Sequence, residues 1–313
     1  MTVAADLANR LNADAEMIDS QFRTVLFDYG MGIVDLLADG GYQPGDSSFV
    51  ELEVSRDDAE TYSEGQQLPD PLESGYQRPE FSFVAFRAVI RESGHERRKR
   101  GQGDAGLSIP DPQRKMNRAA SSMARQIALY FDGTADGQLQ GLIDATTAFG
   151  GLSRTTYSKL KSYELSGATA AVSTALIGKL VTVGADDPYG VQGDVAIASA
   201  TQVRRVREVL AGKHAPTSMA GVNALVGTGV DLVPGLPLMM LPNLTNTEIL
   251  VLSGVRSGSW RTTWNEPNPG RFHVLDLGAA NSDTPMNLQI STSLNIMCSQ
   301  PNEQSKLTSL STG

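Results

Sequence analysis

One segment near the end of the chain alternates between two kinds of side chain over thirteen residues. Between Met286 and Cys298 every second residue is apolar except Thr292, and the intervening positions as far as Asn295 are polar. A period of two places successive side chains on opposite faces of an extended backbone. The segment therefore predicts one long β-strand with a single buried face, which other parts of the chain must cover.

A helix is predicted directly after residue 111. Asp111 and Pro112 match the preference for an aspartate at the N-cap and a proline at the first helical position. Apolar residues then recur at helical spacing up to Gly133: Met116, Ala120, Met123, Ile127 and Tyr130. This pattern indicates an amphipathic helix of about 20 residues, or ~30 Å.

The first ninety residues contain two further patterns. Residues 1–40 show apolar side chains at helical spacing, broken by Gly30 and Gly32, and predict one or two amphipathic helices. Between Gly45 and Ile90 the period changes to two, and the connection between the alternating runs is polar and proline-containing. We interpret this region as a long two-stranded arm with an irregular tip.

The stretch from 139 to 275 alternates between helical and strand patterns, as expected for a compact α+β domain. The predicted helices are 168–180 and 200–210, and the predicted strands are 195–198, 236–241 and 249–252.

Residues that usually carry catalysis or bind metals are sparse. Cys298 is the single cysteine, so an intrachain disulfide and a thiolate metal site are excluded. The histidines, His95, His214 and His273, lack metal-binding or triad spacing. The phosphate-binding loop G-x-x-x-x-G-K-[ST] and the G-x-S-x-G motif of hydrolases are missing from the sequence. We therefore expect no catalytic residue, no bound metal and no cofactor.

Two tryptophans leave an alternative open. Trp260 and Trp264 could stack on a sugar or base, but packing at a domain or subunit boundary is the commoner use of such rings. A hydrolase or sugar-binding domain would combine them with Asp186 and Asp187, although this acidic pair is better explained as a solvated turn.

Charge is distributed unevenly along the chain. The net charge is −9, which disfavours sequence-specific DNA binding. Residues 1–75 hold 16 acidic and three basic side chains, whereas residues 76–130 hold 11 basic and five acidic ones, including the run Arg97-Arg98-Lys99-Arg100. We expect this basic run to meet acidic arm residues of a neighbouring subunit. Apolar stretches long enough to span a membrane, and the pattern of a secretory leader, are missing.

Four sequence stretches, in this order and spacing, resemble the major capsid proteins of tailed bacteriophages, which share the Hong Kong 97 fold. The stretches are FGGLSRTTY (149–157), GDVAIASATQVRRVREVLAG (193–212), GLPLMMLPNLTNTEILVLS (235–253) and QPNEQSKLTSL (300–310). The resemblance implies an α+β capsid fold with these parts: an N-terminal arm at 1–45, an extended loop at 46–110, a peripheral domain with a long spine helix at 111–155, an axial domain at 156–274, and a returning peripheral strand with the C-terminus at 275–313.

The resemblance also implies a function. The chain would self-assemble through hexamers and pentamers into an icosahedral head that encloses double-stranded DNA, without catalysis. Its partners would be other copies of itself and scaffolding, portal and decoration proteins, and assembly would take place in the host cytoplasm. The candidate subunit contacts are Arg97, Arg98, Lys99, Arg100, Met116, Met123, Trp260 and Trp264.

Two points qualify this expectation. Some members of the family join subunits covalently through a lysine on the extended loop, but no lysine lies between Val50 and Glu96, so this cross-link is not expected. An encapsulin-like bacterial compartment, which packages enzyme cargo in place of a genome, is the alternative within the same fold.

Overall fold

The computed structural model describes residues 32–53, 75–92, 112–186, 193–210, 227–233, 235–265, 273–276 and 286–312. The chain forms two compact units. The first unit is made of Met1–Asp46, Phe83–Phe131 and Thr262–Asn295. The second unit is made of Ser47–Ser82, Asp132–Arg261 and Ile296–Gly313.

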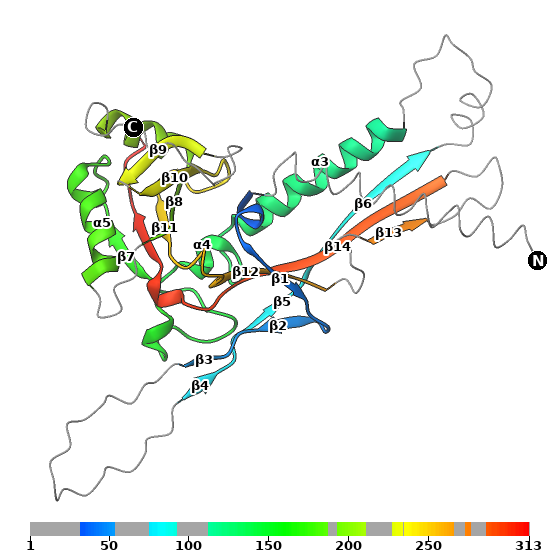
Figure 1. The fold of residues 1–313 in the computed structure, drawn as a ribbon, viewed down its shortest axis with the longest axis horizontal. Helices are drawn as coiled ribbons and strands as arrows, with labels where there is room; N and C mark the ends of the chain where they lie inside the picture. Colours follow the sequence, from blue (N-terminus) through cyan, green and yellow to red (C-terminus); the bar gives the residue numbers. More distant parts are fainter. Residues whose placement is uncertain are drawn as a thin grey trace, which may run out of the picture. The chain divides into compact units, whose positions relative to one another are not determined.

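The first unit is built on a five-stranded sheet in the order β1-β12-β14-β13, with β6 also paired to β14 (Figure 1). The strands are β1 Ala38–Tyr42, β6 Val84–Glu92, β12 Trp260–Trp264, β13 His273–Asp276 and β14 Met286–Cys298. The long alternating segment is confirmed as β14, which pairs antiparallel with β6 from Met286↔Glu92 to Leu294↔Val84.

The predicted buried face of β14 is confirmed where its side chains are described. Ile290, Leu294 and Cys298 are fully buried. The end of the strand differs from the prediction, because Asn295 and Met297 on the opposite face are also buried. The Asn295 side-chain oxygen is satisfied there, since it accepts a hydrogen bond from the Thr263 hydroxyl of β12.

The predicted helix is confirmed as α3, Pro112–Phe131, which packs against β6 and the short 3₁₀ helix η1, Gly32–Asp35. Its buried side chains continue the predicted stripe and are Ala120, Met123, Ala124, Ile127, Ala128 and Phe131. Tyr130 departs from the prediction, because it is 37% exposed. Phe86 of β6 approaches both aromatic rings at the end of α3, with centroid distances of 5.9 Å to Tyr130 and 6.1 Å to Phe131.

The prediction of helices over 1–40 is wrong for its last part, and residues 1–31 lie outside the described residues. Residues 38–42 form β1, whose sequence ADGGY contains two glycines that disfavour a helix. Pairing with β12 then fixes the extended conformation, as expected when tertiary contacts decide a weak local preference.

The second unit contains a six-stranded sheet in the order β7-β15-β11-β8-β10-β9. The strands are β7 Tyr163–Ser166, β8 Val195–Ala198, β9 Gly227–Val233, β10 Leu236–Met240, β11 Ile249–Leu252 and β15 Ser305–Thr308. The predicted strands β8 and β11 are confirmed at the same bounds, and β10 ends one residue early. Both β8 and β11 are buried at every position, as expected for central strands covered on both faces.

Two helices contribute to the core of this sheet. The helix α6, Ala200–Leu210, is confirmed at its predicted bounds, and it buries Val203 and Val206. The helix α5, Thr174–Asp186, lies beside β7 and β15 (Figure 1) and buries Ile177 and Leu180 in the same core.

The predicted bounds of α5 are wrong by six residues at each end. Ala168 and Thr169 have positive φ angles of 49° and 62°, which a right-handed helix does not contain. The helix begins after Ser173, whose hydroxyl accepts a hydrogen bond from the Leu176 N–H at 3.3 Å, the usual arrangement of an N-cap serine.

The predicted two-stranded arm appears as two short antiparallel pairs in the second unit. Ser47–Phe49 (β2) pairs with Glu80–Ser82 (β5), and Leu52–Glu53 (β3) pairs with Tyr76–Gln77 (β4). We call these four strands the hairpin. Its tip, residues 54–74, lies outside the described residues.

None of the described helices is long and apolar enough to cross a membrane.

Candidate functional site

A basic groove lies between β6 and α3 in the first unit, and its cavity volume is about 570 Å³. Its described lining residues include four basic ones and no acidic one; the basic residues are Arg87, Arg91, Lys115 and Arg118. Phe86 of β6 packs against α3, so the side chains of Arg87 and Arg91 point to the other face of the sheet, and Lys115 and Arg118 provide the cations on the α3 side. The Lys115 ammonium donates a hydrogen bond to the Arg91 carbonyl oxygen at 3.2 Å, which ties the first turns of α3 to β6. We call this feature the basic groove.

Local periodicity places these residues in two pairs. Arg87 and Arg91 lie four residues apart on β6 and share the face opposite to Phe86, while Lys115 and Arg118 lie three apart on α3 and are neighbours on its surface. Cations concentrated in a concave site attract anions, and arginine binds a carboxylate or a phosphate through two parallel hydrogen bonds. The basic groove is therefore suited to an anionic partner.

The hairpin exposes two aromatic rings. Phe49 is 52% exposed and Tyr76 is 57% exposed. The Arg78 guanidinium lies 4.8 Å from the centroid of the Phe49 ring, and its Nε lies 3.6 Å from the Glu51 carboxylate. Paired strands this short are marginally stable in water without further packing. The base of the hairpin has such packing, since Ser48 and Phe81 are buried, so its two exposed rings form the second candidate contact surface.

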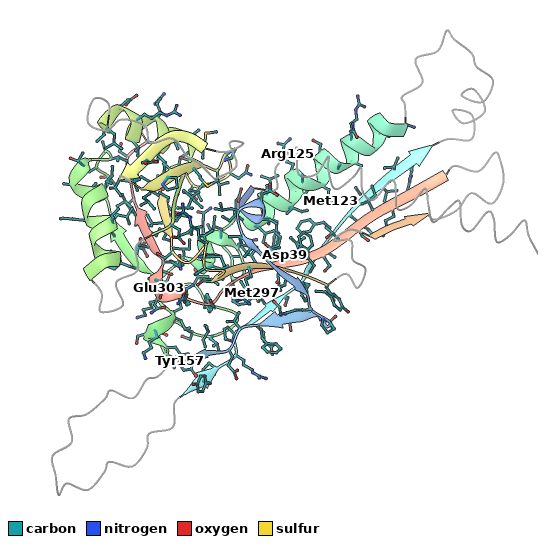
Figure 2. The ribbon with its side chains drawn as sticks, viewed as in Figure 1. Asp39, Met123, Arg125, Tyr157, Met297 and Glu303 are labelled. Atoms are coloured by element: carbon teal, nitrogen blue, oxygen red, sulfur yellow. The ribbon has the colours of Figure 1, made fainter. Side chains whose placement is uncertain are left out.

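Of the residues predicted as subunit contacts, the structure describes three side chains, and one of them, Met123, also lines the basic groove. Met123 lies on α3 (Figure 2) and is 3% exposed, while the tryptophans of β12 are 0% exposed at Trp260 and 4% at Trp264, so these three side chains pack within the folded chain. The run Arg97-Arg98-Lys99-Arg100 lies outside the described residues. Met116 belongs to α3, but its side chain is also outside the described set.

The alternative of a sugar- or base-stacking site gains nothing from the tryptophans, because buried rings present no face to a ligand. Asp186 is the last residue of α5, and Asp187 lies outside the described residues.

The basic groove and the exposed hairpin rings were not predicted individually. The excess of basic residues over 76–130 is the sequence signal that could have found the groove, but it predicts a contact only for the run Arg97-Arg98-Lys99-Arg100.

Arg154 of the second unit is a buried arginine with several hydrogen-bond partners, and only 1% of its surface is exposed. Its guanidinium donates to the carbonyl oxygens of Gly141 at 3.0 Å, Leu142 at 2.9 Å and Leu160 at 2.7 Å, and also to the Asp144 carbonyl. Burial lowers its pKa from 12.5 to about 10, against the opposing charge of Asp144, so the group stays protonated at neutral pH. Its acceptors are backbone carbonyls and the Ser162 hydroxyl at 3.3 Å, so Arg154 joins segments of the folded chain.

No catalytic or metal-binding constellation is found among the residues that the structure describes. No group of three or more His, Cys, Asp or Glu side chains in these ranges is placed to hold a metal ion. Cys298 is fully buried, and burial raises the pKa of its thiol to about 12, which keeps it from acting as a nucleophile at neutral pH.

Comparison with known proteins gives a clear result for the fold alone. Neither a protein-family model nor a curated protein sequence matches the chain. The capsid of cyanophage A-1(L) matches with a TM-score of 0.64 at 11% identity, over 89% of this chain and 92% of that chain. The capsid of the native GTA particle matches with a TM-score of 0.62 at 14% identity, over 89% of each chain.

A third match is the encapsulin SrpI of Synechococcus elongatus, with a TM-score of 0.56 at 14% identity, over 90% of this chain and 87% of that chain. Sequence identities this low establish a shared fold and carry no further conclusion. The predicted fold is confirmed: the chain has the α+β fold of phage major capsid proteins and related shell proteins, the Hong Kong 97-like fold that its sequence resembles.

Proposed function

We propose that this chain is the major capsid protein of a tailed bacteriophage. It assembles through hexamers and pentamers into an icosahedral shell around double-stranded DNA, and it has no catalytic role. The observation that carries the proposal is the capsid fold shared over 89% of this chain and 92% of the cyanophage capsid chain. A match at this coverage leaves little of either chain for an unrelated domain.

In this proposal, residues 1–45 are the N-terminal arm and 46–110 the extended loop. Residues 111–155 and 275–313 are the peripheral domain, and 156–274 the axial domain.

Two surface properties support assembly. The hairpin exposes Phe49 and Tyr76, which a neighbouring subunit would cover.

The second property is charge. Residues 54–74 carry six acidic side chains and one arginine, and the basic groove of another copy offers Lys115 and Arg118. Opposite charges on two parts of the same chain fix the register of neighbours and favour correct encounters. In this proposal the run Arg97-Arg98-Lys99-Arg100 also meets acidic arm residues of a neighbouring subunit.

The wider set of partners follows from this role. Scaffolding, portal and decoration proteins would act during and after assembly in the host cytoplasm, and the product would be the virion. The shell would enclose DNA without sequence-specific binding, because a net charge of −9 does not favour a tight hold on a polyphosphate.

A second candidate is an encapsulin-like shell, supported by the fold shared with the encapsulin SrpI. The two candidates differ in content, since one encloses a genome and the other enzyme cargo. Shells purified from the native source distinguish them: nuclease-protected double-stranded DNA supports the phage role, and a stoichiometric co-purifying enzyme supports the compartment.

The first test is size-exclusion chromatography with light scattering on the expressed protein, followed by negative-stain microscopy of the same fractions. The proposal expects rings of five or six subunits or megadalton shells. A monodisperse monomer of 33.4 kDa that persists at high concentration, with and without a co-expressed scaffolding protein, would count against both shell functions.

A further inference from the structure

A tight turn in the second unit has an unusual tip. Phe149 and Leu152 form an isolated antiparallel bridge, with hydrogen bonds of 2.9 Å and 3.0 Å between their backbone groups. The two residues at the tip, Gly150 and Gly151, both have positive φ angles, 54° and 79°. Two positive φ angles in succession are what a type I′ turn requires, and glycine adopts them without steric cost. We call residues 149–152 the glycine turn.

Asp136 fixes this turn. Its Oδ1 accepts the Gly150 N–H at 2.8 Å, and its Oδ2 accepts the Gly151 N–H at 2.8 Å. Successive backbone N–H groups form a concave site that favours an anion, and here the chain's own carboxylate occupies it. Both oxygens of Asp136 are therefore used to hold the tip of the turn.

The tip of the glycine turn contacts the base of the hairpin. The Glu80 N–H, at the start of β5, donates to the Gly150 carbonyl oxygen at 3.0 Å. A Cβ added at Gly150 would lie 2.5 Å from the Cβ of Pro79 and 2.8 Å from the Glu80 nitrogen, so only glycine permits this approach. Beside this contact, Phe81 and Phe149 pack edge to face with centroids 5.3 Å apart.

We infer that Asp136 is a positioning residue that, through the glycine turn, sets the direction of the hairpin relative to the rest of the second unit. The effect of this direction on assembly rests on the proposed function, because in a shell the direction of the hairpin determines where its exposed rings contact a neighbouring subunit. The β2–β5 pairing is three residues long on each strand, and the glycine turn adds an attachment to the one that the Ser48 hydroxyl makes to the Met297 sulfur at 2.9 Å.

The two glycines provide a matched pair of variants. G150A and G151A both place a side chain at a positive φ, so both strain the turn. They differ in surroundings, because a Cβ at Gly151 meets no atom within 4 Å whereas one at Gly150 collides with Pro79. A third variant, D136N, keeps one acceptor but points an N–H₂ group at one of the backbone N–H donors.

The direct measurement is hydrogen exchange of the unassembled protein, comparing peptides that cover 47–53 and 76–82 with peptides that cover 195–210 in the core. We expect G150A and D136N to exchange at least tenfold faster than the wild type in the hairpin peptides only, and G151A to match the wild type there. Equal exchange of G150A and G151A in these peptides would overturn the inference. This comparison requires no assembly, so it stands even where the proposed function fails.

The consequence is measured on assembled particles by negative-stain microscopy. The wild type and G151A should give shells of one diameter, and G150A and D136N should give mixed diameters or free capsomers. Uniform shells from G150A and D136N would overturn the role in assembly, while a wild type that forms no oligomer would instead refute the proposed function. Melting curves of all variants identify any loss that reflects general unfolding.

Discussion

The ammonium of Lys306 lies 3.4 Å from the carboxylate of Asp144, 162 residues earlier in the chain. Both side chains are largely buried, with exposed fractions of 9% for Lys306 and 15% for Asp144. The pair attaches the strand β15 to the loop that follows the short helix α4, Leu139–Leu142. The same carboxylate accepts hydrogen bonds from the Thr147 N–H at 3.0 Å and from the Thr147 hydroxyl.

This pair predicts a loss of stability in acid. Burial by itself would raise the pKa of Asp144, but the bonds from Thr147 and the charge of Lys306 outweigh it and lower the pKa from 3.8 to about 2. A lowered folded-state pKa contributes stability that is complete above pH 3.8 and is lost as the pH falls toward 2. After allowance for solvent screening, we expect a loss of roughly 1–2 kcal/mol over this interval.

Urea unfolding at a series of pH values checks this in the wild type and in Asp144→Asn. The variant should lack this acid-dependent step and should be less stable at pH 7 by about 2 kcal/mol, because Lys306 is left buried beside a neutral amide. Glu208→Gln is the control, since it removes one partner of the exposed pair Arg204–Glu208 and should change stability by less than ~0.5 kcal/mol. An unchanged acid profile in Asp144→Asn would contradict the prediction.

Arg154 should be intolerant even of lysine. A lysine ammonium has three donors on a flexible stem and cannot reproduce the planar fork that serves the carbonyls of Gly141, Leu142 and Leu160. Carbonyls left unsatisfied in the interior cost about 1–3 kcal/mol each, so Arg154→Lys should lower the free energy of unfolding by at least ~2 kcal/mol.

Guanidinium chloride unfolding measures this difference. Arg261→Lys is a matched control, because the Arg261 Nε also donates to a backbone carbonyl, that of Gly258 at 2.7 Å, but from an exposed position. Its effect should stay within ~0.5 kcal/mol. Equal losses in the two variants would show that burial of the Arg154 network does not matter.

Charge reversal in the basic groove should impair assembly in a salt-dependent way. Arg118→Glu places a carboxylate beside Lys115 in the lining of the groove, whereas Arg125→Glu makes the same change at an exposed position of α3 outside the lining (Figure 2). If an acidic segment of another copy occupies the groove, Arg118→Glu should raise the concentration needed for assembly at least tenfold and reduce its dependence on salt.

Light scattering across a protein dilution series at 50 and 300 mM salt makes this comparison. Arg125→Glu should behave as the wild type does. Identical assembly curves for the two variants would show that the groove is not an assembly surface.

Removing the exposed rings of the hairpin should affect assembly more than folding. Phe49 and Tyr76 are each about half exposed, so Phe49→Ser and Tyr76→Ser remove little burial from the isolated chain and should change its stability by less than ~1 kcal/mol. If a neighbouring subunit covers these rings, the same changes should reduce the yield of rings or shells severalfold in sedimentation velocity. A wild-type yield from the double variant would contradict the proposed contact.

Some elements were determined by the sequence alone because their stabilising interactions have a local period. Residues 112–131 and 286–298 present an apolar stripe with helical or strand spacing, and burial of that stripe is the same whichever layer covers it. The strand β8 and the helix α6 follow the same reasoning and have their predicted bounds. The absence of catalytic spacing is likewise a property of the sequence.

Other features were decided only by the tertiary structure. β1, β7, β12 and β15 are four or five residues long and carry weak alternation, so pairing with strands distant in sequence made them extended. The glycine turn could be suspected from Gly150 and Gly151, but nothing in the sequence placed Pro79 or Asp136 beside it. The periodicity of a segment indicates which of its faces is buried. It does not indicate which other segment covers that face, because this depends on the tertiary packing of the whole chain. The contact between the glycine turn and the hairpin and the basic groove between β6 and α3 both depend on that packing.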